Sequence, residues 1–288
     1  MSDLQVFPIC TPGGIEQSAP EPTEADLEEL KNFGIYRNRV GIRAPLKLLA
    51  TLTDDSGSAA SVTDIIDITE HLGVVYVLSH STATDKVYLH KMQTDGSNVN
   101  TTGGTWPGGA TPPIPLVVYS SVATKPTLML TSFTGGTAAS PEDRLYISDY
   151  NQVLDTKYVT ATDSGSPQIN TLAIDFDASG SNENAKFSLM KSFKFHLWGT
   201  GFFEAAVLRP EMLRFSQPGT IPGTDIAGGA NPREWWSADH RSVGRRGDKI
   251  VALEVAGDRL LVFQKRATHA IYGSGSTTWT RQEVSNVT

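Results

Sequence analysis

The sequence predicts an all-β protein built from repeated antiparallel hairpins, and two observations support this prediction. Gly, Ser and Thr are abundant while helical patterns are scarce, a composition typical of many short strands joined by turns. Four segments also share one pattern: an apolar strand, a polar or Gly-bearing connection, and a second strand with aromatic or β-branched residues. Such runs favour a pleated and largely buried surface.

The sequence of residues 1–34 predicts an irregular arm that precedes the hairpins. A short helix is expected over about 24–33, because Thr23 can cap its start and Leu27, Leu30 and Phe33 recur at helical spacing. Gly34 is suited to end this helix. Before it, residues that break regular structure are frequent: Pro8, Pro12, Gly13, Gly14, Pro20 and Pro22. We therefore expect an arm at 1–34 and a hairpin domain at 35–288.

The four hairpins follow one another along the second part of the chain. Their paired segments are Val74–Leu78 with Lys86–His90, Thr127–Leu130 with Arg144–Ser148, Lys194–Trp198 with Met212–Ser216, and Arg259–Phe263 with Thr268–Tyr272. A further strand is expected at Thr277–Gln282.

The hairpins recur at an irregular interval, which favours a β-propeller-like array with about four blades. Aligning Val87, Leu145, Leu213 and Ala270 gives separations of 58, 68 and 57 residues. The extra length falls in Gly/Pro/Ser-rich inserts at 100–115, 132–142, 176–184 and 217–234. A fixed hairpin with variable inserts suits propeller blades, although an ordinary β-sandwich would also contain similar hairpins. Small four-bladed propellers exist, but blades of this length more often close rings of six to eight. We therefore expect an incomplete ring, with the chain belonging to a longer polypeptide or the ring completed by other subunits.

Charge and composition exclude several classes of protein. The net charge of −7 argues against general nucleic-acid binding, which relies on clustered Lys and Arg. Cys10 is the one cysteine and cannot form an internal disulfide. The N-terminus lacks a basic stretch followed by an apolar run, and no window approaches 18 apolar residues. We expect neither a secretory signal nor a membrane span.

Patterns that carry catalytic or cofactor chemistry are missing from the sequence. The six histidines have no metal-site spacing and several fall within strand patterns, where a structural role is expected: His71, His80, His90, His196, His240 and His269. No nucleophile elbow, P-loop or dinucleotide fingerprint is present. The segment Asp175–Gly180 opens like a calcium loop, but Lys186 stands where a bidentate Glu is required. We predict no enzyme activity, no metal and no cofactor.

Two tryptophans beside the 217–234 insert are the candidate subunit-interface residues. Trp235 and Trp236 are adjacent, so on a strand they point to opposite faces, and one can be buried while the other lies in an interface. Their other interpretation is that both pack the insert onto its own sheet. Arg233, Arg245 and Arg246 flank them and belong to the same candidate interface. The cluster Arg241, Arg245, Arg246 and Lys249 is interpreted as a solvated face or a subunit contact, with a phosphate contact as the alternative.

The C-terminal third resembles phage virion proteins with propeller-like cores, including the nozzle (tubular tail) proteins of short-tailed phages. The residues that carry the resemblance are Met212–Gly219, Asn231–Trp235, Gly247–Leu253, Gly257–Lys265 and Ala270–Gly273. Gly13-Gly14 followed by Tyr36–Gly41 also looks like the entry of those proteins into their first blade. The nozzle proteins are much longer than this chain, which leaves open a truncated nozzle, a shorter ring protein or another virion component.

This resemblance implies a structural protein of the phage tail, located in the virion. Its expected partners are copies of itself in a ring and other tail proteins on the adaptor or portal side, with a passing contact with the genomic DNA that exits through the ring. We expect heterologous ring contacts, with residues 217–246 at a subunit boundary. Two alternatives remain from the residues: a carbohydrate-binding or glycan-hydrolysing propeller, and a scaffold propeller that binds peptides.

Overall fold

The computed structural model of the chain describes residues 33–36, 39–42, 52–56, 62, 64–93, 115–137, 140–160, 167–174, 183–204, 207–216, 235–243, 247–273 and 278–286. The chain divides into two compact units, Met1–Leu48 and Leu49–Thr288. In the first unit, β1 (Phe33–Tyr36) pairs with β2 (Arg39–Ile42) as an antiparallel hairpin. The predicted boundary at 34/35 falls inside this unit and stays a prediction.

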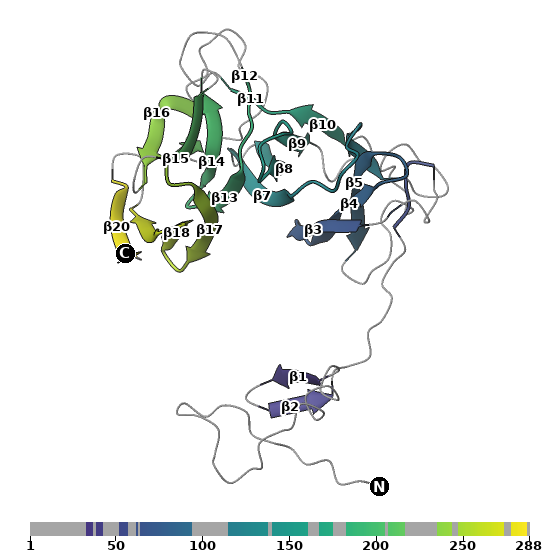
Figure 1. The fold of residues 1–288 in the computed structure, drawn as a ribbon, viewed down its shortest axis with the longest axis horizontal. Coiled ribbons are helices and arrows are strands. Elements are labelled where there is room, and N and C mark those ends of the chain that lie inside the picture. The colour runs from purple at the N-terminus through teal and green to yellow at the C-terminus, as the bar shows by residue number, and fades with distance from the viewer. Residues whose placement is uncertain are drawn as a thin grey trace. The chain divides into compact units, whose positions relative to one another are not determined.

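The second unit is built around four four-stranded antiparallel sheets, each formed by consecutive strands (Figure 1). The first sheet contains β3 (Asp64–His71), β4 (Val74–Ser81), β5 (Lys86–Gln93) and β6 (Leu116–Tyr119). The second contains β7 (Leu128–Thr137), β8 (Ser140–Asp149), β9 (Lys157–Thr160) and β10 (Gln168–Thr171). The third contains β13 (Leu189–Phe193), β14 (His196–Glu204), β15 (Val207–Ser216) and β16 (Trp235–Ser242). The fourth contains β17 (Ile250–Ala256), β18 (Arg259–Gln264), β19 (Ala267–Tyr272) and β20 (Thr280–Asn286).

Between the second and third sheets lies a small connecting pair, β11 (Ala173–Ile174) with β12 (Glu183–Asn184). The residues that flank this pair bind Thr156, which directly precedes β9: Leu172 N donates to Thr156 O at 2.8 Å, and Thr156 N donates to Ala185 O at 2.7 Å. The insert predicted at 176–184 therefore ends in strand β12, while 176–182 lie outside the described residues.

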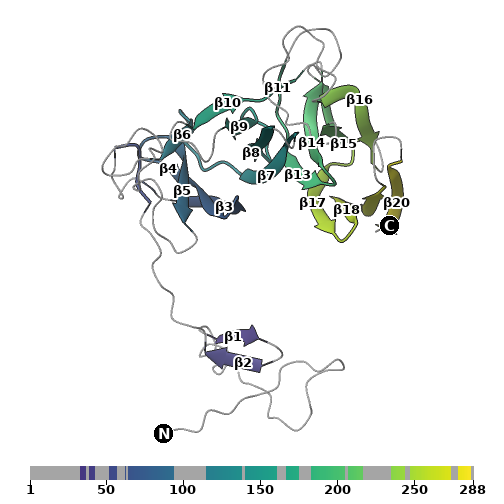
Figure 2. The same ribbon diagram turned by 180° about the vertical axis from the view of Figure 1, so that it is seen from behind.

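The sheets stack face to face in chain order, and an apolar cluster fills each junction. One cluster joins Leu78 and Leu89 of the first sheet to Ile147 and Val159 of the second. The next cluster joins Tyr146 and Tyr158 of the second sheet to residues of the third, such as Met190, Leu197 and Phe202. The first and fourth sheets lie at opposite ends of the row in both views (Figures 1 and 2).

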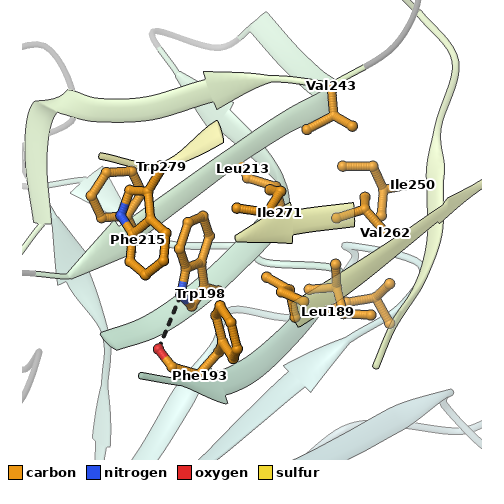
Figure 3. Close-up of a cluster of buried hydrophobic side chains, with 12 residues drawn as sticks. Leu189, Phe193, Trp198, Leu213, Phe215, Val243, Ile250, Val262, Ile271 and Trp279 are labelled. Atoms are coloured by element: carbon orange, nitrogen blue, oxygen red, sulfur yellow. Dashed lines mark hydrogen bonds between the residues drawn. The ribbon is translucent and has the colours of Figure 1, made fainter. Parts of the chain in front are cut away.

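Four aromatic rings pack together with aliphatic side chains in the junction between the third and fourth sheets (Figure 3). The ring centroids of Trp198 and Phe215 lie 4.7 Å apart, and those of Trp198 and Trp279 lie 5.3 Å apart in an edge-to-face arrangement. The indole N–H of Trp198 donates to Phe193 O at 3.3 Å, so this buried ring also satisfies its polar atom. Large aromatic rings bury extensive apolar surface, which ties the two sheets together.

The all-β prediction is confirmed, since every element among the described residues is a strand. All four predicted hairpins form antiparallel pairs, in β4–β5, β7–β8, β14–β15 and β18–β19. The helix predicted over about 24–33 falls outside the described residues, apart from Phe33, which opens β1.

Three predicted boundaries were wrong. The segment 132–142 is not an insert, because β7 and β8 continue through it as paired strands up to Thr137 and Ser140. Lys194 and Phe195 form the turn before β14 rather than its start, with φ values of 47° and 61°. The final strand begins at Thr280 instead of Thr277 and reaches Asn286, paired with β19 along its length.

No helix in the described part of the chain has the length and apolar character needed to span a membrane.

Candidate functional site

A cavity of about 430 Å³ lies where the first strands of the four sheets meet. Its walls come from β3, β7, β13 and β17 together with the loop that follows β8. The lining residues are Thr69, Met129–Ser132, Tyr150, Leu189–Ser192 and Val251–Glu254. Because every first strand is the edge of its sheet, the cavity is bordered by sheet edges rather than by sheet faces.

Polar side chains join each first strand to the next. A carboxylate oxygen of Asp67 in β3 accepts a hydrogen bond from Leu130 N in β7 at 2.7 Å. Thr131 Oγ1 in β7 donates to Met190 O in β13 at 3.0 Å. Both contacts satisfy backbone groups on a sheet edge, where strand pairing leaves N–H and C=O groups without partners.

The third junction is closed by an ion pair between β13 and β17. Lys191 Nζ lies 3.0 Å and 3.1 Å from the two carboxylate oxygens of Glu254. The hydrogen bond from Lys191 is the main cause that lowers the pKa of the Glu254 carboxyl, and the Val255 N–H at 3.1 Å adds to it. Glu254 therefore remains an anion at the wall of the cavity.

The rim of the cavity carries a second cation. Lys249 Nζ lies 3.9 Å from the centre of the Tyr150 ring and donates to Tyr150 O at 3.1 Å. Burial lowers the pKa of the Lys249 ammonium, and the nearby Lys265 acts in the same direction. The contact over the ring is a cation–π interaction, which holds the start of β17 against the end of β8.

These contacts join neighbouring sheets along the cavity. Its described lining contains one carboxyl group, that of Glu254, which is engaged by Lys191. Among the described residues, no group of three or more His, Cys, Asp or Glu side chains could hold a metal ion. Residues 175–180 of the loop that opens like a calcium site lie outside the described part, and Lys186 lies 3.7 Å from Asp155 in an ion pair.

Five of the six histidines are buried, as a structural role requires. The contacts of four of them are His71 Nδ1 with Ser132 Oγ at 2.7 Å, His80 Nε2 with Val122 O at 2.7 Å, His90 Nε2 with Ser79 Oγ at 2.8 Å, and His196 Nδ1 with Ser216 O. Burial lowers the pKa of His90 to about 4 and, together with Arg281, lowers that of His269. The side chain of His240 lies outside the described residues.

The predicted interface residues are placed in part. The backbones of Trp235 and Trp236 open β16, where Trp235 pairs with Ser216, but their side chains are not among those described. Arg233, Arg245 and Arg246 lie outside the described residues, as does the insert 217–234. The interface assigned to these five residues stays a prediction.

Sequence reasoning missed the cavity itself. Its walls are the first strands, and three of these (β3, β13 and β17) lie outside the four aligned hairpins, although Gly247–Leu253, which leads into β17, is among the segments that carry the resemblance to phage proteins. The only signal was the Gly-bearing or short turn that follows each of them, at Leu72-Gly73, Lys194-Phe195 and Gly257-Asp258.

Comparison with known proteins adds little to this description. No protein-family model matches the chain, and no curated protein does. A solved structure described as "AfRom2 CNH domain" is similar over 86% of this chain and 78% of its own, with 12% sequence identity and a TM-score of 0.27.

Proposed function

We propose that this protein is a non-enzymatic structural component of a bacteriophage tail, with a propeller-like domain that assembles into a ring with copies of itself. Its partners are further tail proteins on the adaptor or portal side, and the ring surrounds the path by which DNA leaves the virion. The observation that carries the proposal is the side-by-side order of the four first strands, each of which contributes to the lining of one cavity.

That arrangement supports a propeller because blades are four-stranded meanders whose first strands surround a central channel. Each sheet here is a meander of consecutive strands, and each junction between sheets is filled by an apolar cluster. The segments that carry the resemblance to phage nozzle proteins also fall on strands of two adjacent sheets: Met212–Ser216 ends β15, and Gly257–Lys265 contains β18.

The experiment that tests this function is cryo-electron microscopy of the purified chain combined with its mass in solution by light scattering. We expect a cyclic homo-oligomer with rotational symmetry about an open channel. Replacing Trp235 and Trp236 together with Ala is expected to weaken assembly if the 217–246 region lies at the subunit boundary. A strictly monomeric wild-type chain at every concentration would contradict the proposal.

The alternative that demands a direct assay is a glycan-hydrolysing propeller. That chemistry uses two carboxyl groups about 5–10 Å apart, one on each side of the scissile bond. Glu254 is the cavity carboxylate to test, because it faces the lining described above. Turnover of a glycan that is abolished by E254Q would replace the structural proposal with this one.

A further inference from the structure

The outer edge of the fourth sheet is a long exposed strand. The fourth strand of every sheet is its outer edge, opposite the first strand that borders the cavity. In the first two sheets this edge is short, because β6 and β10 contain four residues each, and short edge strands offer little backbone to another chain. β20 contains seven residues, and its outer side pairs with no strand in the described part of the chain. β16 is also long, with eight residues, but its side chains are not among those described.

The backbone of β20 is accessible and regular over most of its length. The side chains of residues 280–285 are all exposed, and that of Val284 is 57% exposed. Thr280–Glu283 pair with β19 in unbroken register, and the register shifts only at Val284. Neither Pro nor Gly interrupts Thr280–Asn286. An edge of this kind presents a row of N–H and C=O groups that a further strand can bind.

Two opposite charges lie on this edge. Arg281 pairs with Ile271 in β19. Two residues further on, Glu283 pairs with His269. Both charged side chains therefore lie on the same face of the sheet, because residues two apart on a strand point the same way. A row of like charges would repel a second copy of the strand, whereas a base and an acid two residues apart can complement each other across an antiparallel pair.

The charges select one register for such a pair. When two copies of β20 run antiparallel with Gln282 opposite Gln282, Arg281 of each copy lies opposite Glu283 of the other. A pair centred on Arg281 or on Glu283 would instead bring like charges opposite each other, which is unfavourable. In the favoured register Thr280 lies opposite Val284 of the second copy, so this exposed apolar side chain becomes partly covered.

We propose that β20 pairs with β20 of a second copy, antiparallel and centred on Gln282, so that two four-stranded sheets become one continuous sheet across a two-fold axis. The contact is isologous, because both copies use the same surface. It is distinct from the heterologous contact that builds the proposed ring. Together with that ring, it joins two rings; without the ring, it joins two chains.

The test reverses one charge at a time in the full chain. R281E leaves two acids and E283R leaves two bases on the strand, so each variant repels its own copy at both charged pairs. R259E is the matched control, because Arg259 carries the same charge in the same sheet, is 57% exposed and lies at the turn between β17 and β18. Light scattering gives the mass of each protein, and far-UV circular dichroism checks that each is folded.

We expect R281E and E283R each to have about half the mass of the wild type, and R259E to have the wild-type mass. An equimolar mixture of R281E and E283R should return to the wild-type mass, because acids then face bases at both positions. The double variant R281E/E283R should do so by itself. Wild-type mass in both single variants, or a mixture that does not reassemble, overturns the contact.

A disulfide tests the register without changing either charge. Residues directly opposite in an antiparallel pair have Cα atoms about 4.5–5.5 Å apart, which a disulfide can span. In a C10S background, oxidised Q282C should therefore give linked dimers on a non-reducing gel, while V153C, at a loop residue that is 71% exposed, should not. Linkage no greater for Q282C than for V153C overturns the proposal, also where a charge variant fails to fold.

The wild-type mass separates this contact from the ring. A ring whose mass is unchanged in R281E and E283R keeps the proposed function and overturns the β20 contact. A complex of two chains that both variants dissociate supports the β20 contact and contradicts the ring. A wild type with the mass of one chain overturns both.

Discussion

Lys191 and Glu254 occupy equivalent positions in successive sheets, and their side chains form an ion pair with an Nζ–Oε1 distance of 3.0 Å. In the earlier junctions the equivalent side chain binds a backbone group of the next first strand. Here Lys191 binds the side chain at the equivalent position of the next sheet, Glu254, instead. The third and fourth sheets are thus joined by an ion pair, at the one junction where both equivalent residues are ionisable.

Removing this charge should have a small and pH-dependent effect. The Lys191 hydrogen bond lowers the pKa of Glu254 in the folded protein, so its contribution is present above the unfolded pKa and is lost as pH falls through the folded pKa. Because the pair is partly exposed, we expect E254Q to lower the free energy of unfolding by about 0.2–1 kcal/mol at pH 7. Urea titrations at pH 7 and pH 3 check this, and the difference between variant and wild type should be smaller at pH 3.

His90 should make the protein sensitive to mild acid. Burial lowers its pKa to about 4, so below an unfolded pKa of about 6.5 the unfolded chain binds more protons than the folded one. Stability should therefore fall as pH drops from 6.5 towards 4, by about 2 kcal/mol from this residue at pH 5. H90Q keeps a polar partner for Ser79 and removes the titration. A pH dependence of unfolding that is unchanged in H90Q would contradict this assignment.

An aromatic ring fills the space that a side chain at Gly199 would need. A Cβ atom at this position would lie 2.6 Å from two ring carbons of Phe187, which is itself fully buried. We expect G199A to destabilise the third sheet by about 1–3 kcal/mol through overpacking. Thermal unfolding measures the loss, and the double variant G199A/F187L should recover part of it relative to F187L alone. Strictly additive effects would show that the ring does not limit this site.

Asp149 organises the loop that leads from β8 to β9. Its carboxylate accepts hydrogen bonds from the N–H groups of Asn151 at 3.1 Å, Val153 at 2.9 Å and Leu154 at 3.0 Å, and the residue is buried. D149A leaves these donors without their acceptor and should cost about 3 kcal/mol. D258A is the control, because the Asp258 side chain is 76% exposed and its removal should be nearly neutral. Similar losses for both variants would argue against the role of Asp149 as the acceptor for these N–H groups.

The hairpins could be predicted because their strands are continuous apolar runs separated by polar turns. The second repeat was nevertheless aligned out of phase. Leu145 lies on the second strand of its sheet, whereas Val87, Leu213 and Ala270 lie on third strands. The Gly135-Gly136 pair within β7 resembles a loop in sequence, although both residues are paired across the hairpin. Contacts between first strands recur at 59 to 63 residues, a more regular interval than the predicted one.

The side chains that join the first strands could not be predicted, because the residues at equivalent positions differ in chemistry. Asp67, Thr131, Lys191 and Glu254 are an acid, an alcohol, a base and an acid, so no sequence repeat marks them. What they share is that each side chain binds a polar group on the first strand of a neighbouring sheet. The predicted interface at Trp235 and Trp236 rested on aromatic content, and the described side chains do not test it.

The consecutive order of strands within every sheet also bears on how the chain folds as it is synthesised. Each sheet needs only a continuous stretch of chain, so it can form before the next one leaves the ribosome. A newly formed sheet then shows an uncovered apolar face until its successor docks. Leu78, Tyr146 and Trp198 would each pass through this exposed stage in turn, and chaperone binding to nascent chains should peak after each sheet emerges and fall when the following one is complete.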